Sequence, residues 1–126
     1  MNKYLLVMVG GGLGSLARYV LSTEINNRIL GRFPIGTIAV NVTGSFLIGL
    51  LMVLLTEGFQ LNPNWRLLLV VGFLGGYTTF STFEFETLQL LQSGRPLLAI
   101  LYVSSSVTIG LLAVWGGAAL ARRLLL

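Results

Sequence analysis

Long runs of apolar residues dominate this 126-residue chain and leave it few ways to fold. A transmembrane helix needs about 20 predominantly apolar residues, and four stretches reach that length. Four such spans occupy roughly 80 positions, so only short loops remain. We therefore expect an all-α membrane protein with a single domain over residues 1–126. The stretches are Tyr4–Ile29, Phe33–Thr56, Trp65–Leu91 and Pro96–Leu120.

The scarcity of charged side chains supports a membrane protein. Hydrophobic residues make up 55% of the chain and charged residues 10%, which is too little charge for the surface of a soluble domain. The net charge of +4 does not indicate nucleic-acid binding, because the basic residues are scattered at the ends of the segments. The chain has no cysteine and no histidine, so thiol catalysis and the commonest general base are missing. We therefore do not expect the chain to be an enzyme.

The basic residues divide almost evenly between the two sides of the membrane. With four spans, the N-terminus, the second loop and the C-terminus share one side, which carries four basic residues against three on the other. The positive-inside rule orients a protein by this difference, and a difference of one is a weak instruction. Either the chain has a small preference for one orientation in the membrane, or it inserts in both orientations and pairs with an inverted copy. The two sets are Lys3, Arg66, Arg122 and Arg123, and Arg28, Arg32 and Arg95.

The first span combines small residues with a charge. Gly10, Gly14 and Arg18 recur every four residues and share one helix face. Small residues at this spacing predict close helix packing. A buried guanidinium needs a partner, water or an anion. Arg18 therefore either lines an aqueous vestibule or extends its side chain to the membrane interface.

The second span carries one strongly polar side chain, Asn41, in its middle. Thr37, Asn41, Ser45 and Gly49 again recur every four residues. The Asn41 amide offers donors and an acceptor. It serves either to hold helices together or to present a donor to a pore.

The third span is the unusual one. The apolar run Leu67–Leu74 is too short to cross a membrane, and paired glycines and many hydroxyls follow it. Irregular backbone at membrane depth is tolerated only inside protein or along a cavity. We predict a broken helix near Gly75–Thr79, where free backbone groups could bind ions. A kinked but continuous helix is the alternative.

Two further pairs of side chains stand out at helical spacing. Phe80 and Phe83 share a helix face, although phenylalanines at this spacing usually belong to a core. Tyr102 and Ser106 lie one turn apart in the fourth span. Hydroxyls in such a helix often bond back to their own carbonyls.

Three motifs carry a resemblance to a known family: GGGLGSLARY at Gly10–Tyr19, GTIAVNVTGSF at Gly36–Phe46 and GFLGGYTTFSTFEFE at Gly72–Glu86. With these motifs in this order, the chain resembles the Fluc (CrcB-type) fluoride channel family over essentially its whole length. The resemblance implies an antiparallel, dual-topology homodimer in the cell inner membrane, with two fluoride pathways. It also implies passive export of cytoplasmic fluoride and fluoride resistance.

The resemblance also assigns roles to residues. It implies that Phe80 and Phe83 line the fluoride pathway and that Asn41 points into it. It implies that the backbone carbonyls of Gly75 and Thr78, from both subunits, hold a structural sodium ion on the two-fold axis. The other implied residues are Arg18 in an electropositive vestibule, Tyr102 and Ser106 in a polar track, and the hydroxyl donors Thr79, Ser81 and Thr82.

The chemistry of fluoride suits these residues. Fluoride is small and tightly hydrated, so a pore must replace its water with donors. Hydroxyls and the asparagine amide can donate, and phenyl ring edges carry partial positive charge. A pore without lysine or arginine at its centre does not hold the anion too tightly.

Two other functions compete with this one. A proton-coupled small multidrug exporter needs a carboxylate inside the membrane, and Glu24, near the end of the first span, is poorly placed for it. Glu84 and Glu86 are the other candidates. A non-transporting assembly subunit would use its polar residues only for packing, which does not require a broken helix.

Overall fold

The computed structural model describes residues 2–31, 33–59 and 61–126, and all regular structure within them is helical. Arg32, which entered the charge count, lies outside the described residues. Two segments have the wider π-helical hydrogen bonding and are labelled η. The elements in chain order are α1 (Lys3–Arg28), α2 (Ile35–Val53), η1 (Leu54–Gly58), η2 (Arg66–Leu74), α3 (Gly75–Tyr77), α4 (Ser81–Gln92) and α5 (Pro96–Leu124).

Within the described part of the chain, four helices are long and apolar enough to cross a membrane, which confirms the predicted number of spans. The fourth helix runs to Leu124, past the predicted end at Leu120. The prediction stopped where the apolar stretch stops. Arg122 continues the helix because its long side chain can reach the interface, where Nη2 lies 3.5 Å from Oε1 of Glu57. These spans are Lys3–Arg28, Ile35–Gly58, Arg66–Gln92 and Pro96–Leu124.

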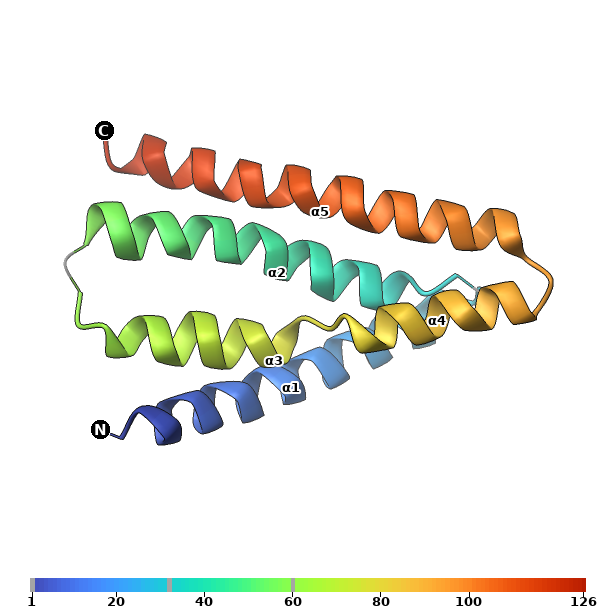
Figure 1. The fold of residues 1–126 in the computed structure, drawn as a ribbon, viewed down its shortest axis with the longest axis horizontal. Coiled ribbons are helices and arrows are strands. Elements are labelled where there is room, and N and C mark those ends of the chain that lie inside the picture. The colour runs from blue at the N-terminus through green and yellow to red at the C-terminus, as the bar shows by residue number, and fades with distance from the viewer. Residues whose placement is uncertain (1, 32, 60) are drawn as a thin grey trace.

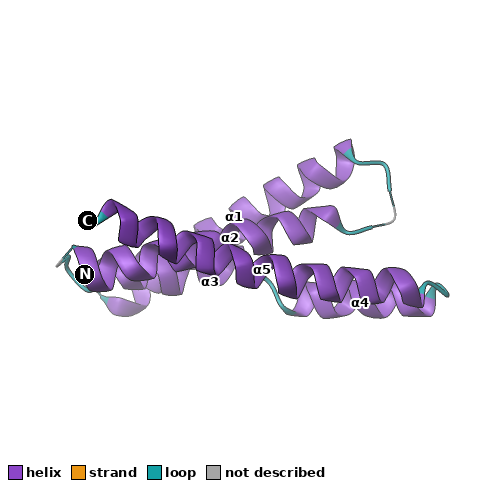
Figure 2. Cartoon of the chain, turned by 90° about the horizontal axis from the view of Figure 1, so that it is seen from above, coloured by secondary structure: helices purple, strands orange, loops and turns teal. Residues whose placement is uncertain are grey.

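The helices run along one long axis, with both chain termini at the same end (Figure 1). The helix α2 packs mainly against α5, and α1 packs against η2 and α3. At the end away from the termini, the α1–α2 connection diverges from the α4–α5 connection (Figure 2). The subunit is therefore forked at that end.

Glycines allow the closest helix contacts. Gly10 and Gly14 are buried, and a Cβ on either would clash with the backbone of the third span. Gly49 on α2 and Gly117 on α5 would clash in the same way with each other's helix. The predicted small-residue packing face of the first span is confirmed, and α2 and α5 use the same device.

The third span changes its backbone conformation near its middle. The helix α3 ends at Tyr77, and Thr78 is extended, with φ −83° and ψ 156°. Residues 78–80 are not helical, and α4 begins at Ser81. The ribbon in Figure 1 shows this short non-helical link between α3 and α4, which we call the interruption. It lies at the C-terminal end of the glycine-rich stretch in the sequence.

The turn between α4 and α5 follows from two local signals. Gly94 has φ +72°, the left-handed conformation that ends many helices. The Arg95 N–H donates to the Leu90 carbonyl at 3.0 Å, and the Gly94 N–H donates to Leu91 at 3.1 Å. Pro96 then occupies the first turn of α5, where no N–H donor is needed.

Much of the surface is apolar. On α5, Leu111 is 67% exposed and Trp115 is 71% exposed, one turn apart. An apolar surface of this kind is costly in water and suits lipid or another subunit.

Candidate functional site

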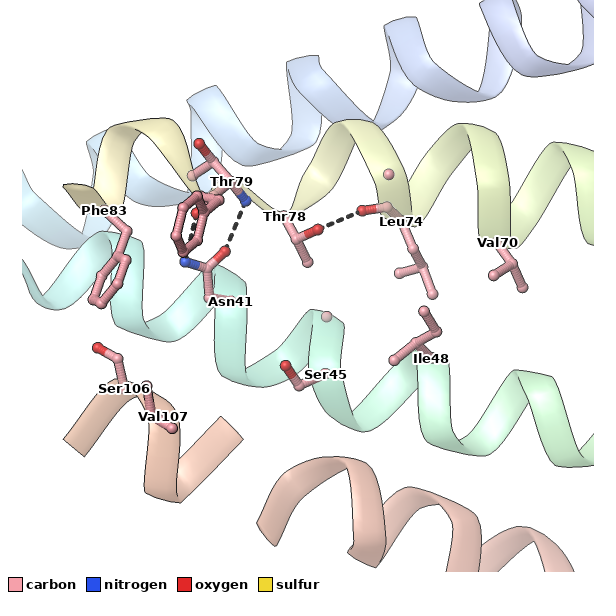
Figure 3. Close-up of a pocket in the computed structure, with 13 residues that line it drawn as sticks. Asn41, Ser45, Ile48, Val70, Leu74, Thr78, Thr79, Phe83, Ser106 and Val107 are labelled. Carbon is pink, nitrogen blue, oxygen red and sulfur yellow. Dashed lines mark hydrogen bonds between the residues drawn. The ribbon is translucent and has the colours of Figure 1, made fainter. Parts of the chain in front are cut away.

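A cleft of about 410 Å³ opens beside the interruption, between the second, third and fourth spans (Figure 3). Residues of α2, η2, α3, α4 and α5 line it together with the interruption. Most of the sequence-predicted site residues meet here, although they come from distant parts of the chain. Those that line the cleft are Asn41, Gly75, Thr78, Thr79, Phe80, Phe83 and Ser106.

Asn41 holds the interruption in place from α2. Its Nδ2 donates to the Thr79 carbonyl at 2.9 Å, and its Oδ1 accepts from the Thr79 N–H at 2.8 Å (Figure 3). The amide thus supplies both backbone hydrogen bonds that Thr79 loses by lying outside a helix. Because Nδ2 carries two hydrogens, one donor remains for another partner. The structure therefore combines the interhelical role with a position on the cleft.

The interruption also leaves backbone acceptors free. The Leu74 carbonyl receives the Thr78 N–H at 3.0 Å and the Thr78 hydroxyl at 2.9 Å. Among residues 2–31, 33–59 and 61–126, no hydrogen bond reaches the carbonyl oxygens of Gly75 and Thr78. Gly75 is exposed and Thr78 is half-buried. Such free carbonyls are the hard oxygen ligands that an alkali cation prefers, so the pair fits the predicted sodium site.

The two phenylalanines differ in their surroundings. Phe83 is only 8% exposed and its ring centroid lies 5.1 Å from that of Tyr102. Phe80 is 73% exposed, with its centroid 6.0 Å from that of Phe83. Phe83 therefore belongs to a core cluster as well as to the cleft, whereas Phe80 is no part of the core of this subunit.

Ser106 carries an orphan donor. Its hydroxyl is buried and has no hydrogen-bond partner in the described chain. It lines the cleft and points from α5 toward Phe83 (Figure 3). Buried polar atoms are nearly always paired, so this hydroxyl is available to a ligand. It does not bond back to its own helix, the alternative for hydroxyls in this span.

Two of the predicted hydroxyl donors lie beside the cleft and not on its lining. The Thr82 side chain accepts from the Thr79 hydroxyl at 3.1 Å, at the start of α4. Ser81 is exposed on the first turn of α4. Of the three predicted donors Thr79, Ser81 and Thr82, Thr79 alone lines the cleft.

Tyr102 belongs to a polar cluster on the far side of Phe83. Its hydroxyl donates to Glu86 Oε2 at 2.6 Å, and Thr37 donates to Glu86 Oε1 at 2.8 Å. Tyr102 is fully buried and Thr37 is 4% exposed. Sequence reasoning named Glu86 only as a candidate carboxylate of the rival exporter, and it gave Thr37 no role beyond its place in the four-residue row of Asn41. Their pairing joins different helices and leaves no local signal.

Arg18 lies away from the cleft. Its Nε donates to the Gly76 carbonyl at 3.1 Å, across the contact between α1 and α3. The Ser15 hydroxyl reaches the same oxygen at 3.5 Å. Arg18 is partly buried and therefore faces the back of the interruption in this subunit.

The three relatives named here share the description fluoride-specific ion channel FluC. The family described as "CrcB-like protein, Camphor Resistance (CrcB)" matches residues 5–118. A fluoride-specific ion channel FluC of Solibacter usitatus is 60% identical over 121 residues, which cover 96% of this chain and 99% of the relative. The FluC of Acidobacterium capsulatum is 52% identical and covers 97% of this chain and 98% of its own. The archaeal FluC of Pyrococcus abyssi is 45% identical, with 94% and 95% covered.

Proposed function

Because this chain belongs to the CrcB-like family, we propose that it forms a fluoride-selective channel through which fluoride leaves the cytoplasm passively. It is a multi-pass membrane protein and not an enzyme. We place it in the cell inner membrane, where it confers fluoride resistance. The observation that carries this proposal is the cleft at the interruption, where a buried hydroxyl without a partner lies beside an asparagine amide and two phenyl rings.

The donors of the cleft replace the water around fluoride. The Ser106 hydroxyl is free, and Asn41 has one N–H beyond its two bonds to Thr79. The rings of Phe80 and Phe83 present partially positive edges where no hydroxyl stands. Among the described residues that line the cleft there is no arginine or lysine. The anion is therefore not held by a full positive charge that would slow its release.

The polar cluster around Glu86 extends the path beyond Phe83. Phe83 lines the cleft and contacts Tyr102, whose hydroxyl bonds to Glu86. Glu86 in turn lines a second cavity of about 250 Å³ near the α4–α5 turn. Polar groups therefore follow one another from the cleft toward the end of the membrane span, as a polar track requires.

A second, inverted copy of the chain completes the proposed channel. The exposed carbonyl of Gly75 and the free carbonyl of Thr78 would hold a sodium ion together with the same atoms of the partner. The ion would supply a fixed positive charge at the interruption. The nearly even split of basic residues between the two sides supports dual topology, because the positive-inside rule then gives little preference for one orientation.

The proton-coupled multidrug exporter finds no support among the relatives named above, which are described as fluoride-specific ion channels. An exporter would have to expose the Glu86 carboxylate to a cationic drug. Here that carboxylate accepts hydrogen bonds from the hydroxyls of Thr37 and Tyr102.

A flux assay tests the proposed function. The purified protein is reconstituted into liposomes loaded with potassium fluoride, and a fluoride electrode follows efflux after valinomycin is added. We expect rapid fluoride loss with no pH gradient and no comparable loss of chloride. Absence of fluoride efflux from protein that remains folded in the liposomes would reject the proposal.

A further inference from the structure

The carbonyl of Gly76, in the last turn of α3, accepts hydrogen bonds from side chains of α1, and the proposed function does not use these bonds. Because α3 ends at Tyr77, the carbonyls of its last turn lose the N–H groups that a continuing helix would supply. The Gly76 oxygen is met instead by Arg18 Nε at 3.1 Å and, more weakly, by the Ser15 hydroxyl at 3.5 Å. Both donors come from α1, some sixty residues earlier in the chain.

We infer that Arg18 is a positioning residue, which caps the C-terminal end of the η2–α3 half-helix and so sets the shape of the interruption. Asn41 holds the Thr79 peptide from α2, and Arg18 holds Gly76 from α1. In the chain, the Thr78 carbonyl lies between these two contacts and the Gly75 carbonyl directly precedes them, and no hydrogen bond from the described residues reaches either oxygen. The conformation of the ion-binding backbone is therefore fixed from both sides.

The packing of α1 explains how the guanidinium reaches this carbonyl. Gly14, one turn before Arg18, is buried against the third span, and a Cβ there would lie 2.9 Å from the Tyr77 nitrogen. A Cβ on Gly76 would lie 3.0 Å from the Ser15 hydroxyl oxygen. Since neither helix can move closer or rotate freely, the arginine has a defined place along the contact.

The charge of Arg18 suits this position. No ion pair involves Arg18 among the residues that the structure describes. A cation at the C-terminal end of a helix is favoured by the helix dipole, and a charged donor to a carbonyl is stronger than a neutral one. The alternative is that Arg18 acts at long range, by attracting fluoride to a vestibule.

Two substitutions separate the capping role from the electrostatic role. One keeps the position of the hydrogen-bond donor and removes the charge, and the other keeps the charge and moves the donor. In Arg18→Gln the amide nitrogen stands as many bonds from Cβ as Arg18 Nε does, so the donor stays and the charge is lost. In Arg18→Lys a methylene takes the place of Nε–H, so the charge stays and the donor moves. A capping role favours glutamine, and an electrostatic role favours lysine. Arg28→Gln, on the exposed end of the same helix, is the control for loss of charge.

The experiment measures fluoride efflux from liposomes at low and high ionic strength, the sodium concentration that supports half-maximal efflux, and thermal unfolding in detergent. We expect Arg18→Lys to lose about tenfold in efflux at both ionic strengths, since one charged hydrogen bond is worth about that factor. It should also need more sodium. Arg18→Gln should stay within about threefold of wild type, and Arg28→Gln should match it.

The opposite order overturns the inference: Arg18→Lys at the wild-type rate, with a loss in Arg18→Gln that disappears at high ionic strength. Equal losses in both variants, or no loss in either, also overturn it, because donor position then has no effect. If only Arg18→Gln folds, the inference is supported, and if only Arg18→Lys folds, it is refuted. If neither folds, Ser15→Ala decides, by lowered efflux in favour or unchanged efflux against.

The readouts rest on the proposed fluoride channel, yet the two can fail separately. A wild-type protein that passes no fluoride rejects the proposed function. The order of thermal stabilities, wild type and Arg18→Gln above Arg18→Lys, then still tests the capping contact.

Discussion

At the scale of single residues, the side chains around the cleft differ in how completely their hydrogen-bonding capacity is used. Asn41 spends two of its bonds on Thr79, whereas the Ser106 hydroxyl spends none within the described chain. The first residue shapes the site and the second is free to bind. This difference gives each substitution a distinct expected result.

Ser106→Ala should slow fluoride efflux several-fold while leaving the protein as stable as before or slightly more stable. A buried hydroxyl without a partner costs about 1–3 kcal/mol, so its removal does not weaken the fold. Ser105→Ala is the matched control, because the neighbouring hydroxyl bonds to the Tyr102 carbonyl at 3.3 Å and does not line the cleft. Efflux and thermal unfolding are measured on both variants. A stable Ser106→Ala protein with wild-type efflux would remove this donor from the pathway.

Phe80→Ile should reduce fluoride efflux by tenfold or more without dissociating the assembly. The branched side chain keeps apolar bulk but has no ring edge to offer an anion. Phe85→Ile serves as the control, since Phe85 is 60% exposed on the adjoining helix α4 and does not line the cleft. Equal efflux from the two variants, with unchanged size-exclusion profiles, would contradict a role for the Phe80 ring.

At the scale of helices, close backbone contact decides the geometry. The α2–α5 pair meets at Gly49 and Gly117, where no side chain separates the two backbones. The α1 contact with the third span is of the same kind. Such contacts leave no room for adjustment, which is why the interruption between them can keep one conformation.

Gly117→Ala should destabilise the subunit by about 1–3 kcal/mol, the usual cost of overpacking. Its Cβ would press on backbone atoms of Phe46 and Leu50, which cannot rotate away. The neighbouring Gly116 has open space around it, so Gly116→Ala should be neutral or gain up to about 1 kcal/mol from better helix propensity. Thermal unfolding in detergent compares the two. Similar melting temperatures for both variants would show that the helices do not meet as closely as described.

Local signals made some elements predictable and left others hidden. The lengths of the apolar stretches predict the four spans, and Gly94 and Pro96 predict the turn between α4 and α5. The glycine-rich stretch also drew attention to the third span. The π-helical hydrogen bonding of η1 and η2 has no signal in the local composition.

The partners of polar residues were harder to predict than the residues themselves. Asn41 stood out as the polar group in an apolar span, but Thr79 lies 38 positions away and its peptide is exposed only by the interruption. Arg18 was recognised as needing a partner, and the Gly76 carbonyl that it meets belongs to another helix. Contacts of this range depend on the packing and not on any local pattern.

At the scale of the whole molecule, the chain exposes a large apolar surface, and no described residue donates a hydrogen bond to the carbonyls of Gly75 and Thr78. In the proposed channel, a second copy of the chain would cover both features. The nearly even loop charges allow that copy to be inverted in the membrane.

Replacing sodium by a large organic cation such as N-methyl-D-glucamine should therefore reduce fluoride efflux, with recovery when sodium is returned. The carbonyls of Gly75 and Thr78 leave room for a small cation and offer no carboxylate that would hold a bulky one. Lithium and potassium, at equal ionic strength, control for a general salt effect. Full efflux in the complete absence of sodium would argue against a structural cation at the interruption.

The reversal potential of the purified protein in a planar bilayer tests passive fluoride conduction most directly. Under a tenfold fluoride gradient at equal pH, the current should reverse near the Nernst potential of fluoride, and a superimposed pH gradient should leave that value unchanged. A reversal potential that follows the proton gradient, or the chloride gradient when chloride is varied instead, would contradict a fluoride-selective channel.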